Sequence, residues 1–138
     1  MNQVFKTIVI DDEPAARRLM KNLLQEHTDV VQVIDEAGTG REAIQKIETL
    51  KPDLIFLDIQ MPEMTGFQVL EKMYCTKIPV IVFVTAFDEY AIKAFEVSAT
   101  DYLLKPVDDK RFHQALMRAK SLMEQKDGAG GVTGPNWL

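Results

Sequence analysis

The chain has 138 residues, enough for one ordinary domain with a hydrophobic core of its own. Hydrophobic residues make up 46% and charged residues 27%, a composition typical of a soluble globular domain and not of a disordered chain. The formal net charge of -5 disfavours a nucleic-acid surface on this domain, because phosphate binding needs a basic stripe.

The single cysteine, Cys75, excludes an internal disulfide and favours a reducing compartment. No stretch approaches membrane-spanning length, and the apolar run near the N-terminus is too short for a secretory signal and ends in acids. We therefore expect a cytoplasmic protein that contacts no membrane.

Short apolar runs alternate with helical patterns in the first half of the chain. Val4 to Ile10 is predicted as a strand, and Pro14 after it suits the first turn of a helix. Val30 to Ala37 is predicted as a second strand, and its alternating pattern indicates a less buried position. Apolar residues then recur with helical spacing from Ala43 to Leu50.

The second half continues the alternation. Asp53 to Asp58 is a continuous apolar run bounded by acids, as expected for a central parallel strand that is covered on both faces. The later elements are a helix over Thr65–Met73, a buried strand over Val80–Ala86, a helix over Tyr90–Val97, a short strand over Tyr102–Leu104 and a helix with one apolar face from Phe112 to Met123.

The character of the chain changes after Lys126. Residues 127–138 hold four of the seven glycines and show no periodicity. We therefore expect one domain over residues 1–126, followed by a flexible tail or linker over 127–138 that could lead to an output domain.

Strict alternation of five strands with five helices predicts an α/β fold, an open parallel sheet with helices on both faces. Ligands bind such sheets at the carboxyl ends of the strands. Polar residues follow the apolar runs at those ends, and we expect them to converge: Asp11, Asp12, Asp58, Thr85 and Lys105.

The converging residue types point to a metal ion and a phosphoryl group. Carboxylates that lie close together disfavour one another's ionised form, and a divalent cation removes that conflict. Oxygen ligands in small number suit Mg²⁺. The hydroxyl of Thr85 and the ammonium of Lys105 are groups that a phosphoryl oxygen seeks, and a carboxylate can act as a nucleophile toward phosphorus.

Four motifs carry a resemblance that covers about Lys6 to Glu124: "IVIDDEP", "LIFLDIQMPEMTG", "VTA" and "DYLLKP". In this order the chain resembles the receiver domains of bacterial two-component response regulators. The resemblance implies a flavodoxin-like, doubly wound sheet of strand order 2-1-3-4-5. It also implies a signalling domain that accepts a phosphoryl group, and not an enzyme beyond its own phosphorylation and dephosphorylation.

The resemblance assigns the metal and phosphorylation residues. Asp58 is expected to accept the phosphoryl group from a sensor histidine kinase. Asp12 and Asp58 are expected to ligate Mg²⁺, with Asp11 acting mainly through water and the backbone carbonyl of Gln60 completing the site. Gly66 is expected to give the loop after Asp58 its backbone freedom.

The resemblance also assigns the residues that respond to phosphorylation. Lys105 is expected to pair with the phosphoryl oxygens and to precede Pro106 by a cis peptide bond. Thr85 is expected to hydrogen-bond the phosphoryl group, and Tyr102 to change rotamer with it.

The resemblance implies that the surface formed by the fourth helix, fifth strand and fifth helix changes partner on phosphorylation and supports a homodimer. Tyr90 and Phe95 of the fourth helix could be core residues or part of an exposed apolar patch there. "TAFDEYAIKAFEVSATDYLLKP" is most similar to receivers attached to LytTR-type DNA-binding domains. Any contact with DNA would then come through a C-terminal domain absent from this sequence.

Three other functions fit the same fold. A phosphatase of the haloacid-dehalogenase type needs a second acid two residues after its nucleophile, where this chain has Gln60. A flavin binder needs a glycine- and hydroxyl-rich phosphate loop after the first strand, where "DDEP" would repel the phosphate. A degenerate receiver that only scaffolds would lack part of the acid, threonine and lysine set.

Overall fold

The structure, a computed structural model, describes residues 3–128. Its strands are β1 Phe5–Ile10, β2 Val31–Ala37, β3 Leu54–Leu57, β4 Val80–Thr85 and β5 Asp101–Leu104. Its helices are α1 Pro14–Gln25, α2 Gly40–Leu50, α3 Gly66–Lys72, α4 Ala91–Glu96 and α5 Asp109–Gly128. The predicted alternation of strands and helices is therefore confirmed.

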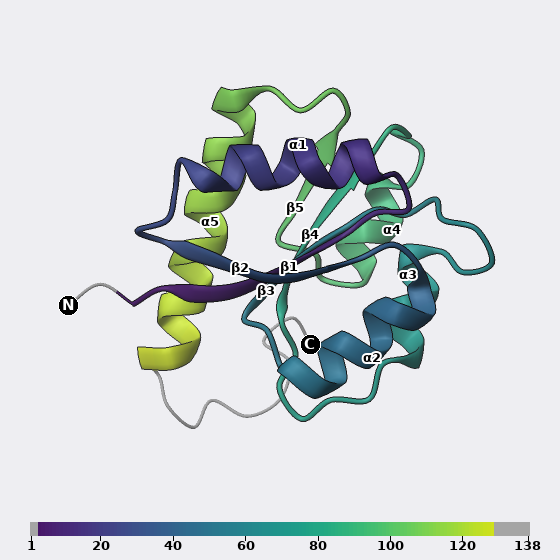
Figure 1. The fold of residues 1–138 in the computed structure, drawn as a ribbon, viewed down its shortest axis with the longest axis horizontal. Helices are drawn as coiled ribbons and strands as arrows, with labels where there is room; N and C mark the ends of the chain where they lie inside the picture. Colours follow the sequence, from purple (N-terminus) through teal and green to yellow (C-terminus); the bar gives the residue numbers. More distant parts are fainter. Residues whose placement is uncertain (1–2, 129–138) are drawn as a thin grey trace.

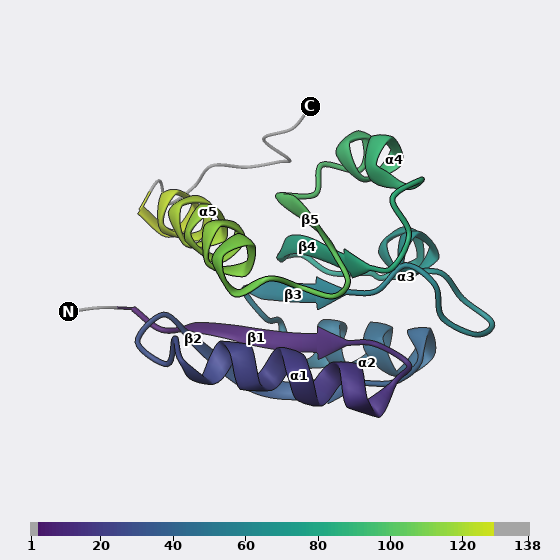
Figure 2. The ribbon, with the colours of Figure 1, turned by 90° about the horizontal axis from the view of Figure 1, so that it is seen from above.

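The five strands form one parallel sheet of order β2-β1-β3-β4-β5, as the resemblance implied. In Figure 2 the arrows of β1, β3 and β4 point the same way, so their carboxyl ends lie at one edge of the sheet. β2 stands at the outer side of the sheet, which explains why most of its residues are only partly buried, as predicted. β3 and β4 are central and completely buried.

The helices cover the sheet in two layers. α1 and α5 pack on one face, where alternate strand residues such as Val9 and Phe56 meet Met20 and Phe112. α2, α3 and α4 pack on the other face, against the intervening strand residues, for example Ile10. Figure 1 shows α1 and α2 on opposite sides of β1 and β2. Because successive strand residues point to opposite faces, each strand contributes side chains to the hydrophobic cores on both faces of the sheet.

The helices nearest the predicted site begin where local sequence favours it. Pro14 occupies the first turn of α1, where its missing N–H costs no hydrogen bond. Thr65 caps α3: its side chain accepts from the N–H of Gln68, whose side chain accepts in turn from the N–H of Thr65. These starts fix the ends of the loops that follow β1 and β3.

α5 runs through Gly128, so it includes the first two residues of the segment predicted as a tail from residue 127. The remainder of that predicted tail, residues 129–138, lies outside the described residues. None of the helices in the described part of the chain is both long and apolar enough to cross a bilayer.

Candidate functional site

The residues that follow the strands are held in place by an extension of the sheet's hydrogen bonding. The N–H of Asp11 donates to the carbonyl of Ala37 at 3.0 Å, and the N–H of Asp58 donates to that of Ile10, also at 3.0 Å. After β5, the outer strand on the side of the sheet away from β2, the N–H of Lys105 donates to the carbonyl of Thr85 at 2.9 Å. The backbone therefore carries the polar side chains to one edge.

Three carboxylates meet at this edge, as predicted. Each of Asp11, Asp12 and Asp58 offers an oxygen, and these oxygens all lie within 4.8 Å of one another. Asp11 and Asp58 are each only 5% exposed, whereas Asp12 is half-buried. A cluster of carboxylate oxygens with one side toward solvent is a donor set that fits a hard divalent cation such as Mg²⁺.

Lys105 lies directly on the acids. Its Nζ is 2.7 Å from Oδ2 of Asp11, 3.2 Å from Oδ2 of Asp58 and 3.8 Å from Oε1 of Glu13. The peptide bond between Lys105 and Pro106 is cis, which confirms the expectation for that bond. The lysine thus supplies positive charge to the two most buried carboxylates of the cluster.

The charges in this cluster influence one another. Burial raises the pKa of Asp58, the neighbouring charge of Asp11 raises it further, and Lys105 opposes both without cancelling them. Burial alone would lower the pKa of Lys105, but its bonds to Asp11 and Asp58 outweigh burial and raise it. The lysine therefore stays charged while the ionised form of Asp58 is disfavoured, which leaves the site receptive to another cation.

Thr85 and Tyr102 are both hydrogen-bonded to the same loop residue, Phe87. Thr85 is buried, and its hydroxyl accepts from the N–H of Phe87 at 3.4 Å. The hydroxyl of Tyr102 donates to the carbonyl of the same Phe87, and its ring packs near that of Phe83. The loop after β4 is thus bonded both to the end of β4 and to β5.

Gln60 connects the loop after β3 to the start of α4. Its N–H donates to Oδ1 of Asp58 at 3.3 Å, and its side-chain Nε2 donates to the hydroxyl of Tyr90 at 2.5 Å. The side chain at this position is therefore engaged with α4, where a phosphatase would need a free acid.

Gly66 is required for a different reason from the one predicted. A Cβ at this position would lie 2.5 Å from the backbone carbonyl oxygen of Asp58 and 3.2 Å from Cα of Ile59. The close approach of the start of α3 to the backbone of residue 58, and not the expected freedom of φ, excludes a side chain here. The loop residue with a positive φ is Glu63, at 69°.

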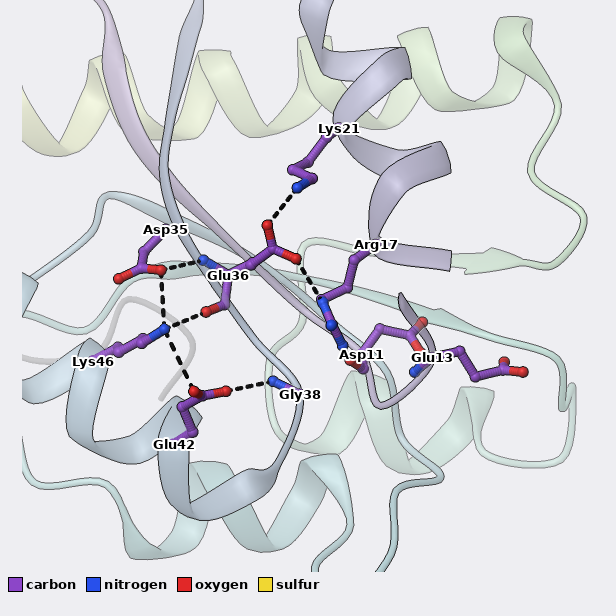
Figure 3. A network of polar contacts seen from close by, with 9 residues as sticks. All are labelled: Asp11, Glu13, Arg17, Lys21, Asp35, Glu36, Gly38, Glu42 and Lys46. Carbon is purple, nitrogen blue, oxygen red and sulfur yellow. Dashed lines mark hydrogen bonds and ion pairs between the residues drawn. The ribbon is translucent and has the colours of Figure 1, made fainter. Parts of the chain in front are cut away.

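A polar network beside the acids was not predicted. Figure 3 shows Glu36, near the end of β2, between Arg17 and Lys21 of α1. The guanidinium of Arg17 also reaches the main-chain carbonyl of Asp11, and Lys46 of α2 donates to the main-chain carbonyl of Glu36. The sequence feature that could have indicated this network is Arg17, an arginine early in the helix that follows Asp11 and Asp12.

The outer surface of α4 and β5 is apolar and open to solvent. Ile92 is 77% exposed, Phe95 71% and Leu104 46%, whereas Tyr90 is half-buried. Of the two alternatives for the apolar residues of the fourth helix, Phe95 therefore belongs to an exposed patch.

Comparison with known proteins agrees with this geometry. Residues 7–117 match the family model described as "Response regulator receiver domain". The transcriptional regulatory protein BtsR of Salmonella typhi is 44% identical over 124 residues, which are 90% of this chain and 52% of BtsR. An uncharacterised response regulatory protein of Vibrio vulnificus is 50% identical over 111 residues, 80% of this chain and 46% of the relative. The chain therefore spans about half the length of these curated relatives.

A solved structure is similar as well. The response regulatory domain of protein mrkE from Klebsiella pneumoniae aligns with a TM-score of 0.79 and 32% identity, over 88% of this chain and 99% of that domain. Sequence and fold thus point to the same group of proteins.

Proposed function

This chain belongs to the response regulator receiver domain family, and from that premise we propose that it is phosphorylated on Asp58 by a sensor histidine kinase. The observation that carries the proposal is a carboxylate, 5% exposed, that contacts a lysine at 3.2 Å inside a cluster of acids. A buried carboxylate beside other acids, whose pKa is raised by burial and by a neighbouring charge, is typical of a functional site.

The proposed metal is Mg²⁺. Asp12 and Asp58 would ligate it directly, Asp11 through water, and the backbone carbonyl of Gln60 would complete the set. When bound, Mg²⁺ neutralises carboxylates and the charge on a transferring phosphoryl group. The raised pKa of Asp58 supports this assignment, because the folded site disfavours that charge until a cation arrives.

In the proposed reaction an Asp58 oxygen attacks the phosphorus of the kinase's phosphohistidine. The P–N bond breaks, its electron pair stays on the imidazole, and an acyl phosphate forms on Asp58. Lys105, already bonded to Asp58 and Asp11, would transfer its contact to a phosphoryl oxygen.

Thr85 and Tyr102 would carry the response. The Thr85 hydroxyl accepts from the N–H of Phe87 and would donate its own hydrogen to a phosphoryl oxygen, so a shift of Thr85 toward that oxygen would pull on its bond to Phe87. Because Tyr102 donates to the carbonyl of the same Phe87, a movement of that loop would release the tyrosine and allow its rotamer to change. Differential contacts of about 1–3 kcal/mol are enough to shift a two-state equilibrium of this kind.

The output would be read at the surface formed by α4, β5 and α5. Its exposed Ile92, Phe95 and Leu104 support a phosphorylation-dependent homodimer there. Similarity to a transcriptional regulatory protein supports a transcriptional output, and we propose a LytTR-type DNA-binding domain outside this sequence as the part that contacts DNA. The proposed location is the cytoplasm, with no membrane contact.

The test is the intact mass after incubation with acetyl phosphate, with and without Mg²⁺. We expect one added phosphoryl group on the wild type in Mg²⁺ only, none on Asp58→Asn, and a normal adduct on the control Asp88→Asn, which changes an exposed acid of the loop after β4. No adduct on folded wild type, or an adduct on Asp58→Asn, would contradict the proposal. Sustained turnover of a generic phosphate ester would indicate a phosphatase instead.

A further inference from the structure

Arg17, in the first turns of α1, connects two parts of the chain next to the acids. Its Nε donates to Oε1 of Glu36 at 2.7 Å, and its Nη1 donates to the main-chain carbonyl oxygen of Asp11 at 2.5 Å. Figure 3 shows the guanidinium between the two. One planar group therefore bonds β2 and the loop after β1 at the same time.

The carbonyl that accepts from Arg17 belongs to the peptide group between Asp11 and Asp12. Because that peptide group is planar, its orientation fixes the direction of the N–Cα bond of Asp12 and so limits where the Asp12 side chain can lie. The Asp11 carboxylate has partners of its own, Lys105 and the N–H of Glu13. Within residues 3–128, by contrast, no hydrogen bond or ion pair holds the carboxylate of Asp12, so its approach to the other acids depends on where the main chain places its Cβ and on its side-chain rotamer.

The guanidinium is itself held firmly. The Arg17 side chain is 17% exposed, and its partner Glu36 also binds Lys21 through its second oxygen. Gly38 leaves room for it, since a Cβ there would lie 3.0 Å from Nη1. The hydrogen bonds of Lys21 and then of Arg17 lower the pKa of Glu36, so that carboxylate remains charged at neutral pH.

We propose that Arg17 is the positioning residue of the metal site: it holds the peptide between Asp11 and Asp12 so that the Asp12 carboxylate meets the other acids. This inference rests on the proposed Mg²⁺ binding. Arg17 touches neither the metal nor the phosphoryl group, and it acts only through the main chain. Groups that orient metal ligands in this way commonly contribute about 10- to 100-fold in metal affinity.

The direction in which Mg²⁺ affinity changes distinguishes a positioning role of Arg17 from an effect of its charge. A cation close to the acids repels Mg²⁺, so the loss of the Arg17 charge alone would tighten Mg²⁺ binding. Loss of the bond to the Asp11 carbonyl would weaken it. Arg17→Lys keeps the charge, but a single ammonium nitrogen has no counterpart of the separated Nε and Nη1 that bond Glu36 and the carbonyl, so we expect one of the two bonds to be lost.

The experiment is calorimetric titration of Mg²⁺ into the unphosphorylated protein, with urea unfolding of each variant in the absence of metal. We expect Mg²⁺ dissociation constants raised by about 10-fold in both Arg17→Ala and Arg17→Lys. The matched control is Lys21→Ala, which removes a cation from the same Glu36 but no bond to Asp11. Its Mg²⁺ affinity should equal or exceed that of the wild type.

Three outcomes would overturn the positioning role of Arg17. Arg17 variants that bind Mg²⁺ as tightly as the wild type, while Asp12→Ala loses binding, would overturn the positioning role and leave the proposed metal site intact. Weakening of the same size in Lys21→Ala would also overturn it, since the loss would then follow general destabilisation. A folded wild type that binds no Mg²⁺ would overturn both the metal site and this inference.

Discussion

Replacement of Lys105 by alanine tests the electrostatic description of the site most directly. The ammonium lies 2.7 Å from Asp11 and 3.2 Å from Asp58, and both carboxylate side chains are 7% exposed. Removing one partner from a buried ion pair costs about 3–5 kcal/mol. Because the Lys105 side chain is 21% exposed and water can partly replace it, we expect Lys105→Ala to lower the free energy of unfolding by the lower end of this range, about 3 kcal/mol. For a domain of this size that loss lowers Tm by roughly 10 °C.

The loss should depend on pH and on Mg²⁺ in a defined direction. Burial already raises the pKa of Asp58, and removal of Lys105 raises it further. The difference in unfolding free energy between wild type and variant should therefore be full at neutral pH and shrink as the carboxyls become protonated in acid. Mg²⁺ should stabilise the variant more than the wild type, because it supplies the missing positive charge.

Urea unfolding at neutral and acidic pH, with and without Mg²⁺, measures both effects. Lys77→Ala is the control: it removes a lysine, 44% exposed, from an ion pair with Asp53, which still accepts from the N–H of Lys6. Because the lysine of this pair reaches into solvent and Asp53, although 12% exposed, keeps its bond from Lys6, we expect a loss of only about 1 kcal/mol. If Lys105→Ala loses no more than Lys77→Ala, the buried charges are not coupled as described and the reasoning is refuted.

Two further predictions concern the same edge. Asp58→Asn should raise the free energy of unfolding at neutral pH, because burial and the charge of Asp11 disfavour the ionised carboxylate. This gain should vanish below the ordinary carboxyl pKa of 3.8, where Asp58 is protonated in both the folded and the unfolded state. Equal stability of the two proteins at neutral pH would contradict the prediction. Gly66→Ala should destabilise the fold by about 2 kcal/mol, since its Cβ would meet the Asp58 carbonyl at 2.5 Å. The thermal unfolding of Gly38→Ala, whose Cβ meets only the end of the Arg17 side chain, provides the comparison and should change less.

The positions of the acids could be predicted because they depend on simple rules. Asp11 and Asp58 each follow an apolar run, and parallel strands end at one edge, so periodicity alone brought them together. The hydrogen bond between the N–H of Asp58 and the carbonyl of Ile10 is the consequence of that register. Lys105 and Thr85 reached the same edge by the same rule.

Other features of the site depend on distances that no sequence pattern contains. The bond between Arg17 and Glu36 joins residues 19 positions apart. β2 also shifts register against β1 between Val33 and Asp35, and an alternating pattern does not reveal such a bulge. Gly66 was expected to provide conformational freedom, but the approach of a helix to a carbonyl is visible only in three dimensions.

The site is divided along the chain. The acids proposed to hold Mg²⁺ all precede α3, whereas Lys105, separated from Asp11 by 94 positions, comes after β4. A break in the loop between Lys72 and Val80 would leave the acids on one fragment and the lysine on the other, joined by the pairing of β3 with β4. Phosphorylation of Asp58 in a mixture of the two fragments would then report their reassembly, and the domain could serve as a split reporter of protein association.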